Sequence, residues 1–236
     1  MKTLYITGAG VSAESGIPTF RGEDGYWTIG SKHYTPMQMA TREMYHSNPT
    51  EFLAWYFHRF ATYRNHGPNP VHYWLADKNL ITQNIDGLDG KAGNRDYISI
   101  HGRLDKMTIY HEQGDNVEVI DTPWEKTDKS ALAPSLMKIF NIKDTPVINQ
   151  SYKPFVLLFD EFYTDLYGID KAQERMNQAD KIVFMGTSFS VNITNMAMDI
   201  AIKHDIPVEV VDPNPVILPY RHVKYHKMTA SEFIQK

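Results

Sequence analysis

The sequence contains no cysteine among its 236 residues. This absence excludes disulfide bonds, thiol catalysis and metal sites built from thiolates. No apolar run approaches the roughly 20 residues that a membrane-spanning helix requires, so we expect no membrane segment. The chain reaches a glycine turn by residue 8, which leaves no room for a secretory signal. From these absences we expect a cytoplasmic protein.

An excess of positive charge is also missing. The chain has 24 Lys and Arg residues against 28 Asp and Glu residues, a formal net charge of −4. General nucleic-acid-binding proteins are usually basic, so this balance argues against nucleic acid as a partner. Hydrophobic residues make up 42% of the chain and charged residues 22%, as in ordinary globular proteins. The length fits one large domain with a small inserted module.

Short apolar runs that favour β-strands recur along the chain. They lie at Thr3–Thr7, Leu80–Gln83, Tyr97–Ile100, Phe155–Phe159, Ile182–Met185 and Val208–Val211. Several are apolar almost throughout, which is typical of parallel strands covered on both faces. Helical patterns, such as Thr50–Asn65 and Asp170–Ala179, lie between them. This alternation predicts an α/β fold with a Rossmann-like parallel sheet.

Two stretches interrupt that alternation. Residues 22–75 look mainly helical and aromatic, and residues 103–152 are rich in turns with only short apolar clusters. We interpret both as insertions that form a smaller lobe, beside a core of residues 1–21, 76–102 and 153–236. Apolar packing is expected to stabilise this lobe, through Trp124, Leu132, Leu136, Ile139 and Phe140.

The clearest motif is the glycine-rich stretch that follows the first apolar run, with the sequence TGAGVSAESGIPTFRG. Gly8, Ala9 and Gly10 lie where a strand leads into a helix, a place where backbone N–H groups can bind a pyrophosphate. A purely structural turn is the other interpretation of so short a motif. Ala13 stands where the dehydrogenase fingerprint has its third glycine, which disfavours an ordinary nicotinamide dehydrogenase.

Three more motifs follow in order, TQNIDGL at residues 82–88, His101-Gly102 and Gly186-Thr187-Ser188. Together with the glycine-rich stretch they resemble the sirtuin family, over roughly residues 3–102 and 152–215. Each motif follows a predicted strand, where ligand sites of α/β folds lie. The resemblance implies an NAD-dependent deacylase that acts on acyl-lysine in proteins or peptides and releases nicotinamide and O-acyl-ADP-ribose. Two alternatives stay open: an ADP-ribosyltransferase or NAD hydrolase that uses the same site, and a non-catalytic NAD-binding module.

The resemblance also implies roles for individual residues. His101 would be the general base that acts on a ribose hydroxyl, a role that suits a side chain titrating near neutral pH, and Asn84 would act beside it. NAD would contact residues of the four motifs and one residue near the adenosine. These are Gly8, Ala9, Gly10, Ser12, Thr19, Phe20, Arg21, Gln83, Asn84, Ile85, Asp86, Gly186, Thr187, Ser188 and Asp212.

Tyr56 and Arg59 lie three residues apart on one face of a predicted helix. Pro68-Asn69 follows twelve residues after Tyr56, and then His72; this layout is similar to that of the sirtuin subgroup that removes malonyl, succinyl and glutaryl groups. A phenol beside a guanidinium offers a directional site for the acyl carboxylate. A packed tyrosine beside a solvated arginine is the alternative. Val156 and Phe159 are the other residues expected to bind the substrate.

The sequence departs from the sirtuin pattern in several places. Most sirtuins hold a zinc ion with four cysteines, whereas Ile109 and Glu112 stand at the first pair of positions here, so we expect no structural metal. Asp89 stands where histidine is common, and Asp212 replaces an asparagine. Asp160 replaces a glycine at the edge where a peptide substrate pairs as a strand. These departures affect peptide binding and acyl specificity more than the catalytic set.

Overall fold

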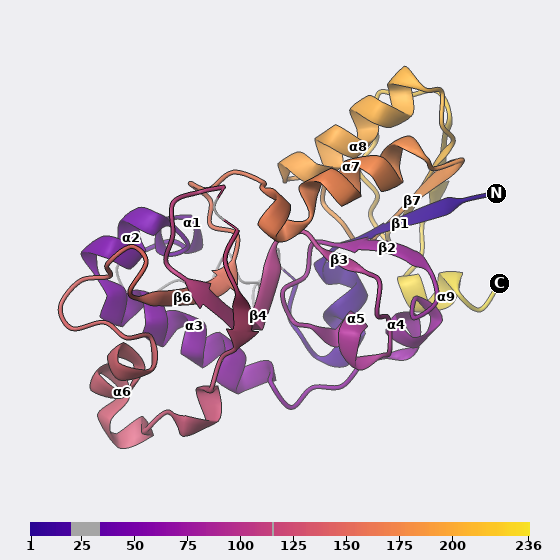
Figure 1. The fold of residues 1–236 in the computed structure, drawn as a ribbon. Helices are drawn as coiled ribbons and strands as arrows, with labels where there is room; N and C mark the ends of the chain where they lie inside the picture. Colours follow the sequence, from indigo (N-terminus) through magenta and orange to yellow (C-terminus); the bar gives the residue numbers. More distant parts are fainter. Residues whose placement is uncertain (20–33, 115) are drawn as a thin grey trace.

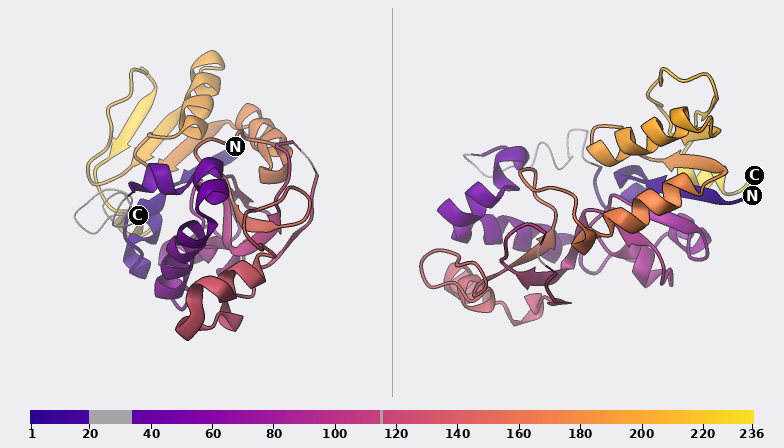
Figure 2. Two further views of the ribbon diagram at one scale, coloured as in Figure 1. Left: turned by 90° about the vertical axis from the view of Figure 1, so that its left-hand side faces the viewer. Right: turned by 45° about the horizontal axis from the view of Figure 1, so that its top comes forward.

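The computed structural model describes residues 1–19, 34–114 and 116–236 of the chain. Two lobes lie side by side, and both chain termini lie at the end of the larger lobe, far from the smaller one (Figures 1 and 2). None of the helices in the described ranges has the length and apolar character needed to cross a membrane.

The larger lobe is built on a six-stranded sheet in which every neighbouring pair of strands is parallel. The strand order is β3-β2-β1-β7-β8-β9. The strands are β1 (Thr3–Thr7), β2 (Asn79–Thr82), β3 (Ile98–Ser99), β7 (Lys181–Met185), β8 (Val208–Val211) and β9 (Val223–His226). The predicted α/β class with a parallel sheet is thus confirmed. Strand β9 was not predicted, because its half-buried sequence VKYH lacks the apolar run of the inner strands.

Helices cover both faces of this sheet, which explains why its inner strands are largely apolar. Alternate residues of β7 point to opposite faces, so Ile182 and Phe184 pack against one helical layer and Val183 and Met185 against the other. The first layer consists of α7 (Ile169–Asn177) and α8 (Asn192–Lys203). The second contains α4 (Pro70–Trp74), α5 (Leu88–Lys91), α9 (Ala230–Phe233) and the 3-10 helix η1 (Ala9–Ser15).

The smaller lobe contains an antiparallel sheet of three strands in the order β5-β4-β6. They are β4 (Gly102–Ile109), β5 (Val119–Asp121) and β6 (Tyr152–Val156). The prediction that Phe155–Phe159 forms a strand of the parallel sheet was therefore wrong. That strand begins three residues earlier and pairs with β4. An apolar run indicates burial but does not identify the partner strand.

Helices surround the smaller sheet. They are α1 (Pro36–Met39), α2 (Arg42–Ser47), α3 (Pro49–Tyr63), α6 (Leu132–Ile139) and the short 3-10 helices η2 (Trp124–Lys126) and η3 (Lys129–Ala131). A further 3-10 helix, η4 (Asp165–Tyr167), precedes α7. Trp124, Leu136 and Phe140 are buried in one cluster, with Leu132 and Ile139 packed at its edge, as the sequence predicted. In contrast, α4 packs on the larger sheet although it lies within the stretch 22–75.

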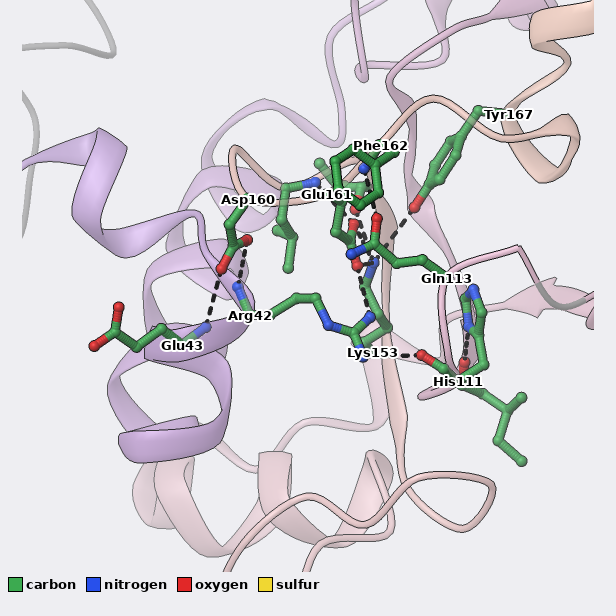
Figure 3. Close-up of polar contacts among 12 residues, drawn as sticks. Arg42, Glu43, His111, Gln113, Lys153, Asp160, Glu161, Phe162 and Tyr167 are labelled. Carbon is green, nitrogen blue, oxygen red and sulfur yellow. Dashed lines mark hydrogen bonds and ion pairs between the residues drawn. The ribbon is translucent and has the colours of Figure 1, made fainter.

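A buried ion network ties the smaller lobe together (Figure 3). The Lys153 side chain is completely buried, and its Nζ lies 2.8 Å from both carboxylate oxygens of Glu161. Glu161 also accepts a hydrogen bond from Arg42 Nη1 at 3.0 Å, and Arg42 Nη2 donates to the carbonyl of His111 at 2.9 Å. Strand β6, helix α2 and the segment after β4 are thus held by one carboxylate and two cations.

Asp160 strengthens the same junction, at the position where the sequence resemblance expects glycine. Its carboxylate accepts hydrogen bonds from the backbone N–H groups of Arg42 at 2.8 Å and Glu43 at 3.3 Å. The backbone N–H of Phe159 donates to the carbonyl of Ala40 at 2.9 Å. The segment after β6 is therefore fixed to the start of α2 by both its backbone and its side chains.

Glu161→Gln should destabilise the protein strongly, because it leaves the buried ammonium of Lys153 without its counter-charge. We expect a loss of roughly 3–5 kcal/mol in the free energy of unfolding, measured by urea denaturation. Asp121→Asn is the matched control, since Asp121 pairs with Lys106 while its own side chain is 84% exposed. That substitution should cost far less. Similar losses in both variants would contradict a structural role for the buried network.

Candidate active site

A cleft of about 1740 Å³ is lined by residues of both lobes, at the carboxyl ends of the parallel strands. It brings together every site residue predicted from the sequence that the structure describes. These are Gly8, Ala9, Gly10, Ser12, Thr19, Tyr56, Arg59, Gln83, Asn84, Ile85, Asp86, His101, Val156, Phe159, Gly186, Thr187, Ser188 and Asp212. Phe20 and Arg21 lie outside the described residues.

Two glycine turns meet on the floor of the cleft. The N–H of Gly10 donates to the carbonyl of Gly186 at 2.9 Å, which joins the turn after β1 to the turn after β7. A Cβ atom at Gly10 would lie 2.7 Å from Gly186 Cα, and Gly186 itself has a φ of 59°. Side chains would separate the two turns, so glycine is required for this contact. The backbone is thereby left open to a ligand at this point.

Ser12 is the centre of a polar network beside that turn. Its hydroxyl donates to Asp86 Oδ2 at 2.7 Å and accepts from Asn84 Nδ2 at 3.1 Å. Asn84 Nδ2 also lies 3.1 Å from the carbonyl of Gly8. The predicted residues of two separate motifs therefore form one hydrogen-bonded unit. Hydroxyl, amide and carboxylate groups together can bind the hydroxyls of a ribose and a carboxamide.

His72 contacts this network through Ser12, and the sequence did not assign a role to it. Its Nδ1 accepts from the backbone N–H of Asn69 at 3.2 Å, so its Nε2 carries the proton that points at Ser12 Oγ, 3.4 Å away. Asn69 caps α4 and its Nδ2 donates to the carbonyl of Val11 at 2.8 Å. Burial lowers the pKa of His72, while the nearby carboxylate of Asp86 opposes that shift. The capping-box spacing of Asn69 and His72 was the signal that could have identified this support.

His101 lies where the chain passes from β3 to β4. The backbone after it requires glycine, because Gly102 has a φ of 80° and a Cβ there would lie 2.1 Å from the carbonyl oxygen of Phe155. The His101 Nδ1 lies 3.0 Å from the carbonyl of Gln83, an acceptor, so Nδ1 carries the proton and the lone pair is on Nε2. Burial lowers the pKa of His101 to about 4, against a smaller opposing effect of the Gln83 carbonyl. The ring is therefore neutral, as a general base must be.

The part of the cleft lined by the smaller lobe contains the predicted pair of residues on α3. Tyr56 is 2% exposed, packed between the rings of Phe52 and Trp55, and burial raises the pKa of its hydroxyl. The guanidinium of Arg59 lies 3.6 Å from the ring centre of Trp55. The stacked ring fixes the plane of the guanidinium.

Asp89 lies behind the Ser12 network, on α5. Its side chain is buried, and Oδ1 has no hydrogen-bond partner within the residues that the structure describes. Burial raises the pKa of Asp89 to about 7 and the nearby Asp86 adds to the shift, while a hydrogen bond from Thr82 opposes it. Asp89 therefore carries a proton over much of the range in which an unfolded aspartate is ionised.

Comparison with known proteins decides the family, since residues 8–193 match the model of the Sir2 family. The chain belongs to the Sir2 family. A sirtuin relative, NAD-dependent protein deacylase 1 of Caldanaerobacter subterraneus subsp. tengcongensis, is 33% identical, and the alignment covers 99% of this chain and 91% of the relative.

Solved sirtuin structures share the fold. A Sir2 homologue in complex with NAD has 29% identity and a TM-score of 0.74, covering 99% of this chain and 86% of that one. A mutant Sir2 homologue in complex with 2′-O-acetyl-ADP-ribose has 29% identity and a TM-score of 0.75, covering 99% of this chain and 88% of that one. Within the described residues of this chain, no group of three histidine or acidic side chains is placed to hold a metal ion.

Asp89→Asn should change how stability depends on pH. In the wild type the folded state holds a proton on Asp89 up to about pH 7, whereas the unfolded state releases it near pH 3.8. Stability is therefore lost as the pH rises from about 4 to 7 and then levels off. Asparagine does not ionise, so the variant lacks this loss. The free energy of unfolding of the variant minus that of the wild type should therefore increase over that interval, by at most about 4 kcal/mol. Urea denaturation at several pH values measures it, and parallel curves would contradict the assignment.

Proposed function

We propose that this sirtuin is an NAD-dependent protein-lysine deacylase that releases nicotinamide and O-acyl-ADP-ribose. The observation that carries the proposal is the neutral His101, whose Nε2 lone pair lies in the same cleft as the Ser12, Asn84 and Asp86 network. The relative named as an NAD-dependent protein deacylase and the solved complex with an acetylated ADP-ribose support it.

The donor and acceptor groups of the cleft suit NAD. Gly8 and Gly10 line the cleft without side chains, so a pyrophosphate can approach this turn closely, and the carboxylate of Asp86 can accept from a carboxamide N–H. When bound, NAD supplies the ribose carbon to which the acyl oxygen is transferred. Asn84 is held by Gly8 and Ser12 and can orient a ribose hydroxyl. His101 Nε2 is the basic atom of the cleft on which the proton of such a hydroxyl can finally reside.

The proposal is tested by incubating the protein with acetyl-, succinyl- and malonyl-lysine peptides, with and without NAD. Mass spectrometry should show deacylated peptide, nicotinamide and O-acyl-ADP-ribose only when NAD is present. His101→Ala should reduce product formation by about 100-fold or more, because a positioned general base contributes that much. If NAD were consumed to ADP-ribose or to a modified protein while every acyl group stayed intact, an NAD hydrolase or ADP-ribosyltransferase would replace this proposal.

We further propose that the enzyme prefers acyl groups with a carboxylate. Tyr56 and Arg59 both line the cleft from α3, and the guanidinium plane is fixed by Trp55. A buried phenol and a planar guanidinium bind a carboxylate with defined direction. An acetyl group offers them no charge to bind.

Arg59→Met should therefore lower kcat/KM for succinyl-lysine peptide by about 10- to 100-fold, the value of a charge-assisted hydrogen bond, and change the acetyl reaction little. Peptide competition assays measure the ratio of the two reactions. Arg221→Met is the control, because Arg221 is 75% exposed and pairs with Asp205 instead. Equal losses for the two acyl groups would exclude a carboxylate-binding role for Arg59.

A further inference from the structure

The catalytic histidine proposed above has a second partner that the family resemblance does not supply. The hydroxyl of Tyr163 lies 2.9 Å from His101 Nε2. Because Nδ1 already carries the ring proton and donates it to Gln83, Nε2 is the acceptor and the tyrosine hydroxyl donates to it. The single basic lone pair of the imidazole is thus occupied by a phenol.

Tyr163 is itself held in a fixed position. The backbone N–H of Ile193, in the first turn of α8, lies near its oxygen and partly offsets the rise that burial gives its pKa. Its ring stacks on the imidazole, with centroids 5.8 Å apart and an angle of 25° between the planes. Two hydrogen bonds therefore link Tyr163 through His101 to the Gln83 carbonyl.

The buried ion network determines where Tyr163 lies. The residue follows Glu161, which Lys153 and Arg42 bind. It also follows Phe162, whose backbone N–H donates to Gln113 Oε1 at 2.5 Å. The segment is thus anchored at Glu161 and Phe162, directly before Tyr163 (Figure 3 shows these two anchors). Tyr163 also lines the main cleft, together with His101.

We propose that Tyr163 relays the proton between the ribose hydroxyl and His101. The hydroxyl proton of the substrate passes to the Tyr163 oxygen while the phenolic proton passes to His101 Nε2, so the tyrosine remains neutral and the imidazole becomes cationic. While the Tyr163–His101 hydrogen bond is intact, any proton that reaches Nε2 must come through Tyr163. Burial raises the pKa of Tyr163 to about 12, so the two transfers have to be coupled and no free phenolate accumulates.

The relay rests on the proposed deacylase function, and the test separates the two. Tyr163→Phe keeps the ring and its stacking but removes the proton. Nicotinamide release from NAD and acyl-lysine peptide precedes the action of the base, so its rate in a single turnover, with enzyme in excess over NAD, should stay within about threefold of the wild type. Formation of O-acyl-ADP-ribose should fall by about 100-fold, as expected for the loss of a general-base pathway. Tyr220→Phe is the control, since the hydroxyl of Tyr220 bonds only to Ala201, Asp205 and Ile206 among the described residues.

A second measurement detects the hydrogen bond between Tyr163 and His101 without substrate turnover. Nitrogen-15 NMR of the imidazole in the free protein should show the Nδ1–H tautomer of His101 in the wild type, and a shifted Nε2 resonance in Tyr163→Phe. Normal nicotinamide release together with wild-type product formation in Tyr163→Phe would overturn the relay alone. Wild-type protein that released no nicotinamide would contradict the deacylase function, and the relay with it.

Discussion

The buried pair of Lys153 and Glu161, completed by Arg42, is the interaction on which the arrangement of the cleft depends. Charges this deeply buried are costly unless each is compensated, so the three side chains tolerate only one relative placement. That placement fixes β6, the segment after it and the start of α2 to one another. Most sirtuins hold their smaller lobe with zinc, whereas the described residues of this lobe use ion pairs, backbone hydrogen bonds and an aromatic cluster around Trp124. This placement matters for function because the segment after β6 brings Phe159 and Tyr163 to the cleft.

In the larger lobe, the arrangement of the cleft depends on a different constraint. Backbone segments approach each other closely at the glycine turns. Gly10 and Gly186 come together only because neither has a side chain, and Gly102 passes the carbonyl of Phe155 for the same reason. These contacts place the ends of β1, β2, β3 and β7 at one edge of the sheet, where Asn84 and His101 can share a ligand with Ser12. The glycines thus serve the catalytic groups indirectly, by removing the bulk that would keep the strand ends apart.

Much of this could be predicted from the sequence, for reasons that are local. The inner strands are apolar runs, the motifs stand directly after them, and parallel strands bring such positions to one edge. The features that were predicted wrongly or not at all depend on long-range contacts. The apolar run after residue 152 predicted a strand but not its partner, and β9 is too polar to stand out. The bond between Tyr163 and His101 joins residues 62 positions apart. No spacing rule predicts such a pair, because an anchored loop and not a regular element brings the tyrosine to the histidine.

Burial gives the cleft its electrostatic character. It moves both His101 and Asp89 toward their uncharged forms, one by lowering a pKa and the other by raising it. Two neighbouring carboxylates are costly to ionise together, and the more buried Asp89 is the one that keeps its proton. Asp86 receives hydrogen bonds from Ser12 Oγ and the N–H of Leu88, which suit a carboxylate. A neutral base and the hydrogen-bonded carboxyl group of Asp86 are therefore available together in the cleft. Because burial and not a charge partner in solvent lowers the pKa of His101, the neutral form of the base follows from the fold itself.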